Sequence, residues 1–284
     1  MPDRNTIKIR RGFIDLPAAQ IHFRHAGEGG RRPLVLIHAS PASSRTLEPL
    51  LQAFASDRRV IAPDTLGNGD STGPIEDGAD ISFFAETCMA ALTQIGIGEF
   101  DLYGTHTGGS IAMEIAIAYP ERVKGLILDG LGLYEPEFQT ELLERYAPAL
   151  KLDHQGMYLS WIWHFVRDTY MFWPWYRLDK EHRRPLGLPS PRVLHDKVVD
   201  VLKAAETYHH PYRAAMRNDK RARLPLLKVP TLAACAQDDM LARYFDEMAQ
   251  LTPGGKAVLT KGIATPDALH DTVQAFRAFL DANA

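Results

Sequence analysis

The apolar positions of the chain form short continuous runs that alternate with longer segments of helical periodicity. Alternating polar and apolar residues over 12–24 predict a β-hairpin. Continuous apolar runs are typical of strands buried on both faces of a parallel sheet, and they occur at residues 33–37, 59–63, 100–103, 123–128, 229–235 and 256–260. Helical periodicity lies between or after them, at residues 47–54, 81–95, 111–119 and 266–280. This order predicts an α/β fold with a doubly wound, mostly parallel sheet.

The alternation of predicted strands and helices stops between residues 130 and 226. This stretch holds all four tryptophans of the chain and a helix-start signal at Ser190, which is followed by proline. We interpret it as a helical cap inserted into the sheet domain. The predicted division is therefore a first core part at 1–133, a cap at 134–225 and a second core part at 226–284.

Length and charge narrow the class of protein. A chain of 284 residues that is 45% hydrophobic has enough apolar material for a sizeable core. Its net charge of −3 does not favour nucleic acid or an anionic membrane surface as a partner. The apolar stretch 157–176 is interrupted by His164, Arg167 and Asp168, which argues against a membrane span. We expect a cytoplasmic monomer or homodimer that acts on a small molecule.

The segment 103–109 has the pattern of a tight strand-to-helix turn. Gly104 and Gly108 lie two residues either side of His106, between an apolar strand and a helix rich in alanine and isoleucine. Small flanking residues allow such a turn to present one side chain at the top of the sheet, as in a nucleophile elbow. The amide of the next residue, Thr107, then points towards the reaction centre.

Three other segments complete a resemblance to a known family. Residues 37–41 (Ile-His-Ala-Ser-Pro) resemble an oxyanion turn, residues 64–71 resemble an Asp-x-x-Gly-x-Gly-x-Ser segment, and the strand starting at Pro230 precedes Asp239 in the place of a triad acid. Their order and spacing resemble the α/β-hydrolase superfamily over nearly the whole chain. The resemblance implies the α/β-hydrolase fold, an oxyanion hole formed by the amides of Ser40 and Thr107, and a catalytic carboxylate at Asp239.

Two departures from the family pattern concern the catalytic residues. The family has serine, cysteine or aspartate at the position of His106, and a catalytic histidine in the loop after the strand that ends near Thr260. That loop holds no histidine, and His270 falls about one turn inside the following helix. The family acid usually reaches the loop histidine, so Asp239 is one candidate to orient His106 and Asp129 is the alternative. The candidate catalytic residues are His106, Asp239 and His270.

Histidine at an elbow supports two kinds of chemistry. An unperturbed imidazole has a pKa of about 6.5 and is largely neutral at pH 7. His106 is therefore expected to attack an acyl group, or to act as a general base that activates water or deprotonates a carbon beside a carbonyl. We predict hydrolysis of an ester, thioester, lactone or C–C bond in a small aromatic or alicyclic carbonyl compound. The alternatives are a lyase on the same fold and a non-catalytic ligand-binding pseudoenzyme.

Aromatic residues concentrated at 158–176 predict an apolar pocket above His106. The expected pocket residues are His38, Trp161, His164, Trp173 and Tyr208, with Arg167 beside His164 at a polar end of the ligand. The resemblance also implies a structural role for His38, with hydrogen bonds to the backbone of the oxyanion turn. No cofactor and no metal are expected, because the histidines lack a ligand spacing such as His-x-x-x-His. Asp64 and Asp70 are expected to brace loops, and Ser110 to be buried in the helix after the elbow.

Overall fold

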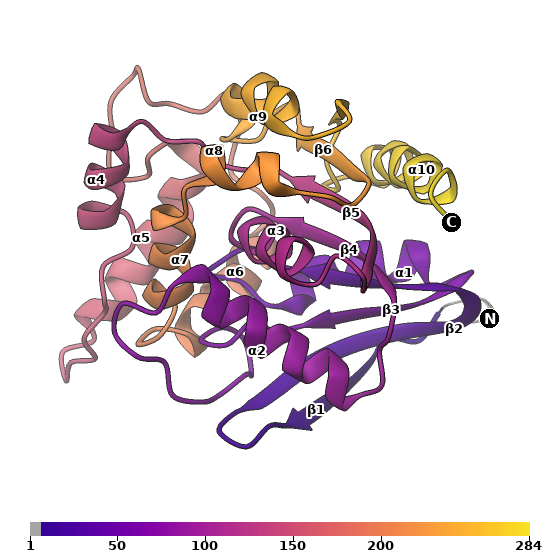
Figure 1. Ribbon diagram of the computed structural model, residues 1–284. Helices are drawn as coiled ribbons and strands as arrows, with labels where there is room; N and C mark the ends of the chain where they lie inside the picture. The colour runs from indigo at the N-terminus through magenta and orange to yellow at the C-terminus, as the bar shows by residue number, and fades with distance from the viewer. Residues whose placement is uncertain (1–6) are drawn as a thin grey trace, which may run out of the picture.

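The computed structural model describes residues 7–284 and contains one seven-stranded sheet (Figure 1). The strand order is β1-β2-β4-β5-β6-β7, and β3 pairs with β2. The strands are β1 (Arg10–Asp15), β2 (Gln20–Ile37), β3 (Arg58–Pro63), β4 (Phe100–Thr105), β5 (Val123–Asp129), β6 (Thr231–Ala236) and β7 (Lys256–Thr260). From β2 through β4, β5 and β6 to β7, every neighbouring pair is parallel. The predicted α/β fold with a mostly parallel sheet is confirmed.

One long strand replaces two that the sequence predicts as separate. β2 continues through residues 25–32, where three charged residues and three glycines interrupt the apolar pattern. Its first half pairs antiparallel with β3 from Phe23 opposite Pro63, and Leu34 in its second half meets Val60 of the same strand. The pairing is irregular across this polar segment, with register shifts between Ala26 and Val35, and regular pairing on either side carries the strand through it.

Helices cover both faces of the sheet. One core cluster includes buried residues of α2 (Ile81–Gln94), α3 (Thr107–Ala118) and α9 (Phe245–Leu251). The other includes buried residues of α1 (Glu48–Phe54) and α10 (Pro266–Asp281). Side chains on the two faces of one strand separate into these clusters, because successive residues of a strand point to opposite sides. This double covering explains why the central strands are continuously apolar.

The chain between β5 and β6 forms further helices: α4 (Pro136–Arg145), α5 (Met157–Met171), α6 (Pro191–Lys203), α7 (His209–Arg217) and α8 (Lys220–Arg223). Figure 1 shows α4 to α7 grouped beyond one end of the sheet. These helices have an apolar cluster of their own, built around Tyr146, Phe165 and Tyr208. The exact bounds of a cap at 134–225 remain a prediction. Across residues 7–284, every helix is too short or too polar to cross a membrane.

Candidate active site

His106 occupies the sharp turn between β4 and α3 in a strained backbone conformation. Its φ of 52° and ψ of −113° make it the one non-glycine residue with positive φ in the part of the chain that the structure describes. Positive φ costs residues with a side chain about 1–3 kcal/mol and persists where the surrounding structure enforces it. The turn holds the His106 side chain at the carboxyl end of the parallel strands, where α/β folds bind their ligands.

The glycines that flank His106 are required by close backbone packing. A Cβ on Gly104 would lie 2.3 Å from the carbonyl oxygen of Gly108, and one on Gly108 would lie 2.3 Å from the carbonyl oxygen of Ile37. Carbon and oxygen atoms cannot approach so closely without displacing the backbone. The two glycines that predict the elbow are therefore also the residues that let the start of α3 pack directly against the end of β2.

The carboxylate of Asp239 contacts the His106 imidazole. Asp239 lies in the loop after β6, and its Oδ2 is 2.9 Å from His106 Nε2. Its Oδ1 accepts a hydrogen bond of 2.7 Å from the amide of Leu241, which fixes the orientation of the carboxylate. His106 and Asp239 follow β4 and β6, and the strand between them, β5, ends at Asp129. The parallel sheet thus brings the pair together across 133 residues of sequence.

The contact with Asp239 assigns the proton on the imidazole. A carboxylate only accepts hydrogen bonds, so Nε2 of His106 carries the proton that it donates to Asp239. In the neutral ring, Nδ1 then holds the free lone pair. The nitrogen available for proton transfer or for attack is therefore Nδ1, and Asp239 orients it.

Opposing effects set the pKa of His106. Burial disfavours the charged imidazolium and lowers the pKa, whereas the charge and hydrogen bond of Asp239, helped by the charge of Asp129, raise it; Lys197 opposes them with a smaller effect. The attraction prevails, and the pKa of His106 lies above its ordinary value. At neutral pH a larger fraction of the ring is therefore protonated than in an unperturbed imidazole.

Asp129 lies beside the pair without bonding to the His106 side chain. Its Oδ2 accepts a hydrogen bond of 2.7 Å from the Tyr103 hydroxyl, and its main-chain carbonyl accepts one of 3.1 Å from the His106 amide. Burial and the neighbouring Asp239 raise the pKa of Asp129 to about 6, against the lowering effect of the Tyr103 hydrogen bond. Asp239, and not Asp129, is the acid in contact with the imidazole.

The two expected oxyanion-hole residues flank the elbow. Ser40 follows β2 and Thr107 is the first residue of α3, and both are buried. Within residues 7–284 neither main-chain amide has a protein acceptor, as expected at the start of a helix for Thr107. The Ser40 hydroxyl accepts a hydrogen bond of 3.1 Å from the Asn68 side chain, which holds the turn in place.

His38 has a structural environment. Its ring is fully buried, Nδ1 lies 2.7 Å from the carbonyl oxygen of Ala39, and Nε2 accepts a hydrogen bond of 3.0 Å from the Thr65 amide. Both nitrogens are therefore occupied by backbone groups, and burial lowers the pKa of the ring. These bonds agree with the expected bonding of His38 to the turn backbone. They direct the ring into the protein interior, so His38 is not among the residues that line the cavity, contrary to its expected place in the pocket.

A small cavity of about 30 Å³ opens beside the imidazole. Its lining includes His106, Thr107, Ser110, Trp173, Tyr212 and Lys220. A volume of this size holds about two water molecules, since one water needs roughly 10–15 Å³. Its polar lining residues include Ser110, Trp173, Tyr212 and Lys220, whose side chains each carry a group that can donate a hydrogen bond.

Trp173 is the one predicted aromatic pocket residue that lines this cavity. Trp161 instead stacks on Phe165 with ring centroids 5.1 Å apart, and the fully buried Tyr208 donates a hydrogen bond of 2.7 Å to the carbonyl of Pro148. His164 is exposed on α5. The placement of Trp161, His164 and Tyr208 at the pocket is wrong, because α5 and α7 use these faces for packing within the helical segment or for solvent.

His270 does not reach the site. It is exposed on α10 and lines a surface groove with Ala53 and Ser56 of the α1 region. Thr265 caps α10, so the helix starts in regular geometry at Pro266 and carries His270 away on its outer face. The prediction of His270 as a catalytic residue is therefore wrong in its geometry. Arg167, expected at a polar end of the ligand, bonds instead to Asp168 at 2.7 Å.

Two polar residues of the cavity have environments that the sequence does not reveal. Ser110 is buried, as expected, and lines the cavity, but its buried hydroxyl has no partner within residues 7–284. Lys220 lies in the polar segment 217–223, which is typical of a solvated loop, yet it is only 6% exposed. No motif or periodicity marks Lys220, because its burial results from how α7 and α8 fold over α3.

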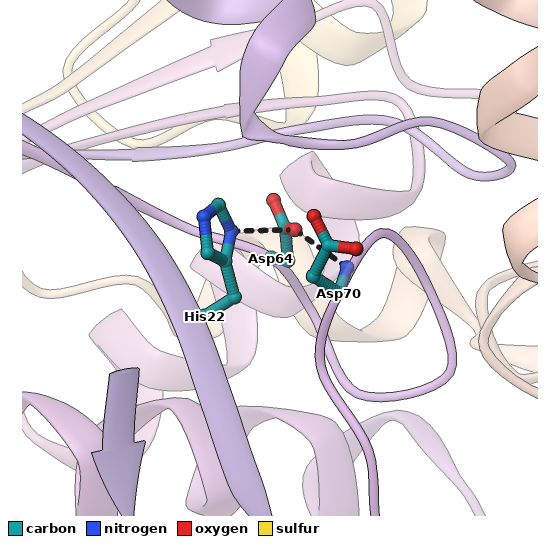
Figure 2. Close-up of side chains that lie close together, drawn as sticks. All are labelled: His22, Asp64 and Asp70. Carbon is teal, nitrogen blue, oxygen red and sulfur yellow. Dashed lines mark hydrogen bonds and ion pairs between the residues drawn. The ribbon is translucent and has the colours of Figure 1, made fainter. Parts of the chain in front are cut away.

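A cluster of possible metal ligands lies away from the cavity. Single ligand atoms of His22, Asp64 and Asp70 lie within 4.8 Å of one another. Figure 2 shows the Asp64 carboxylate bonded to the His22 ring and to the Asp70 amide, at 2.8 and 2.9 Å. Its other oxygen accepts the Ser44 amide at 2.7 Å, and Asp70 pairs with Lys203. These contacts occupy the carboxylates, and the cluster braces the loop at 64–71.

Comparison with known proteins places the site in a family context. Residues 32–169 match a family model described as alpha/beta hydrolase fold. The chain is 28% identical over 243 residues to a putative carbamate hydrolase, RutD, of Yersinia enterocolitica, covering 84% of this chain and 78% of that one. It is 36% identical over 133 residues to a 2-hydroxymuconate semialdehyde hydrolase of a Pseudomonas species, covering 45% of each.

Solved structures share the fold at low sequence identity. The enol-lactonase of Burkholderia xenovorans superposes with a TM-score of 0.72 at 19% identity, over 95% of this chain and the whole of that chain. A hydrolase of Pseudomonas aeruginosa gives a TM-score of 0.73 at 17% identity, over 98% of this chain and 99% of the other. At these identities the likeness establishes the fold, and the chemistry has to be argued from the residues of the site.

Proposed function

We propose that this chain, a member of the α/β-hydrolase superfamily, hydrolyses a small carbonyl compound. In this proposal the His106–Asp239 pair acts as the general base. Nδ1 of His106 takes a proton from water, and the water oxygen forms a bond to the carbonyl carbon. The amides of Ser40 and Thr107 stabilise the resulting oxyanion. The tetrahedral intermediate then expels the leaving group, which takes the proton back from the imidazolium.

The 2.9 Å contact between Asp239 Oδ2 and His106 Nε2 carries this proposal. An acid that orients an imidazole is the base half of a catalytic triad. Here the imidazole itself occupies the elbow, so there is no side-chain hydroxyl at that position for it to deprotonate. Water is the nucleophile that such a pair activates, and the cavity beside His106 has room for it.

The positions of the other histidines favour a general base over a covalent nucleophile. An acyl group on His106 would block the nitrogen that has to activate the water for its own hydrolysis. A second base would then be needed. His270 lies in a surface groove on α10, and His38 is committed to backbone groups of Ala39 and Thr65. A non-covalent role needs only the pair that is in contact.

The size of the cavity bears on how a substrate binds. About 30 Å³ accommodates water but not an ester or a lactone. Trp173, which precedes α6, and Tyr212 of α7 form part of its wall. We therefore expect the helical segment to shift when substrate binds, and this motion also excludes bulk water from the reaction.

The named activities of the relatives support a small carbonyl substrate. Two are described as a putative carbamate hydrolase and a 2-hydroxymuconate semialdehyde hydrolase, and both names contain a carbonyl group. The match to the semialdehyde hydrolase spans less than half of each chain, so it supports the chemical class of the substrate alone.

The test combines a quenched mass-spectrometric assay with turnover of small aryl esters and thioesters. We expect hydrolysis by the native protein with one oxygen from labelled water in the acid product, and no adduct on His106. His106→Ala should lower kcat/KM by about 10²–10⁴, while His270→Ala, the matched histidine control, should not change it.

Other outcomes of this assay distinguish the alternatives. An acyl adduct mapped to His106 would replace the general base with covalent catalysis. Turnover without incorporation of solvent oxygen would indicate a lyase. Absence of any turnover across the panel, with ligands that raise Tm, would indicate a binding protein and contradict the proposal.

A further inference from the structure

Lys220 places a buried positive charge at the wall of the catalytic cavity. Its side chain lies in the short helix α8, is 6% exposed and lines the same cavity as His106. Its Nζ donates hydrogen bonds to the main-chain carbonyls of Ala215 and, at 3.3 Å, Asn218. An ammonium has three donors, so these two bonds leave one N–H uncommitted.

The buried charge of Lys220 lacks a direct counterion. Within residues 7–284 no carboxylate oxygen lies within 4.0 Å of its Nζ. Glu114 is nearby, but its carboxylate is paired with Arg223 and accepts a hydrogen bond from the side-chain amide of Asn218. The Asp219 carboxylate caps α8 by accepting a hydrogen bond from the main-chain amide of Ala222. A buried charge without a partner is unfavourable, and a bound anion would relieve it.

The alternative role for Lys220 is a purely structural one, in which its ammonium caps the carboxyl end of α7. Ala215 and Asn218 lie at the end of α7, where main-chain carbonyls lack partners and a cation is favourable. This role explains the two bonds that Lys220 makes. It does not explain why Lys220 lines the cavity of His106, or why two further residues that line this cavity have unsatisfied polar groups.

Those two groups are the Ser110 hydroxyl and the Trp173 indole. Ser110 is 1% exposed, and neither its Oγ nor Trp173 Nε1 has a hydrogen-bond partner within residues 7–284. Both residues line the cavity. An indole N–H and an ammonium only donate, and a hydroxyl donates as well as accepts. Three donors around one small space match a ligand group that only accepts, with several lone pairs.

We infer that Lys220 binds a carboxylate of the substrate, with Ser110 and Trp173 as additional donors, while the reacting carbonyl lies at His106. A carboxylate offers about four acceptor sites and the negative charge that Lys220 lacks. The substrate class is therefore a carbonyl compound with a carboxylate. This inference rests on the proposed function for the reaction and is independent of it for binding.

The experiment measures binding in His106→Ala, where chemistry does not interfere. The probes are 3- and 4-hydroxybenzoate and, as neutral counterparts, 3- and 4-hydroxybenzamide, each titrated by calorimetry. At least one benzoate should bind tenfold or more tightly than its amide, about the gain from a charge-assisted hydrogen bond. In His106→Ala/Lys220→Met this preference should disappear while the affinity for the amide is kept. Lys203→Met, which removes a surface lysine, is the matched control.

A second measurement does not depend on the Lys220→Met variant folding. Burial lowers the pKa of Lys220 to about 8, against the raising effect of the Asp219 and Glu114 charges. In His106→Ala the benzoate preference should therefore be present at pH 6–7 and decline as the pH rises above about 8. Tyr134 and Tyr212 also line the cavity, but burial raises the pKa of each hydroxyl well above this range.

The outcomes separate the two proposals. An equal affinity for benzoates and benzamides in His106→Ala, or a preference that survives Lys220→Met, overturns the carboxylate site. A benzoate preference that depends on Lys220 supports it, even if the native protein hydrolyses no ester. With hydroxybenzoate acetates as substrates, Lys220→Met should raise KM and keep kcat, whereas a merely structural role would affect acids and amides alike.

Discussion

Asp239 Oδ2 and His106 Nε2 lie 2.9 Å apart, although the loop after β6 and the turn after β4 are separated by 133 residues of sequence. The contact forms because β4, β5 and β6 are parallel neighbours whose carboxyl ends share one edge of the sheet. Asp239 is held in turn by the Leu241 amide. The acid thus fixes which nitrogen of His106 is free to react.

Asp239→Asn should reduce activity strongly. An amide is uncharged and presents either an oxygen or an NH₂ group to Nε2, so the tautomer with a free Nδ1 loses its support. We expect kcat/KM for a small aryl ester to fall by about 10²–10⁴, measured by steady-state kinetics. Asp238→Asn changes the exposed neighbouring carboxylate and should leave the rate within twofold of the native value. Equal rates for the native protein and Asp239→Asn would contradict a catalytic pair.

Alanine at Gly104 should destabilise the protein. The added Cβ meets the Gly108 carbonyl oxygen at 2.3 Å and the Ala112 side chain at 2.6 Å, so the start of α3 has to move. Overpacking of this kind costs about 1–3 kcal/mol of the free energy of unfolding, measured by urea denaturation. Gly98→Ala is the matched control, since a Cβ there meets no atom within 4 Å. A neutral Gly104→Ala would show that the elbow tolerates a wider turn.

Glycine at position 106 should stabilise the protein relative to alanine. In regular structure alanine is the more stable of the two, but at the positive φ of His106 a Cβ is strained. We expect His106→Gly to unfold with a free energy about 1–2 kcal/mol higher than that of His106→Ala. The usual order, with alanine more stable, would mean that the backbone at 106 relaxes once the imidazole is removed.

Asp129 should make stability fall as the pH rises through its titration. Burial raises its pKa to about 6, so the folded protein holds a proton that the unfolded chain releases near its ordinary pKa of 3.8. The stabilisation of the folded state by Asp129 is therefore complete below pH 4 and is lost as the pH rises to about 6 and beyond. Urea denaturation at pH 4.5 and 7 should show a smaller loss for Asp129→Asn than for the native protein. An identical loss in both would contradict the raised pKa.

The sequence predicts those features of the site that depend on local sterics and strand order. Gly104 and Gly108 mark the elbow because no larger residue fits against the next carbonyl oxygens, and apolar runs mark the strands that position it. The capped start of α10 places His270 one turn inside the helix, and the structure puts it on the outer surface. Local rules of this kind can be read from the order of residues.

Features that depend on tertiary packing could not be predicted. The orientation of the Asp239 carboxylate depends on the loop after β6, where the Leu241 amide donates a hydrogen bond to it. The spacing of residues in the sequence does not show whether this carboxylate points at His106 or at another loop. Lys220 belongs to a polar segment that is buried only because α7 and α8 fold over α3. The hydrogen bond that the Thr65 amide donates to the His38 ring comes from a segment 27 residues away, so the sequence around His38 does not reveal that its ring is withdrawn from the pocket.

The most direct test of the His106–Asp239 general base is the pH dependence of kcat/KM in the native protein and in Asp239→Asn. His106 has to be neutral to accept a proton, and Asp239 raises its pKa above the ordinary 6.5. We predict a rate that rises with pH through an inflection above 6.5, and an inflection at lower pH for the residual activity of Asp239→Asn. An inflection at or below 6.5 in the native protein, or the same inflection in both, would contradict it.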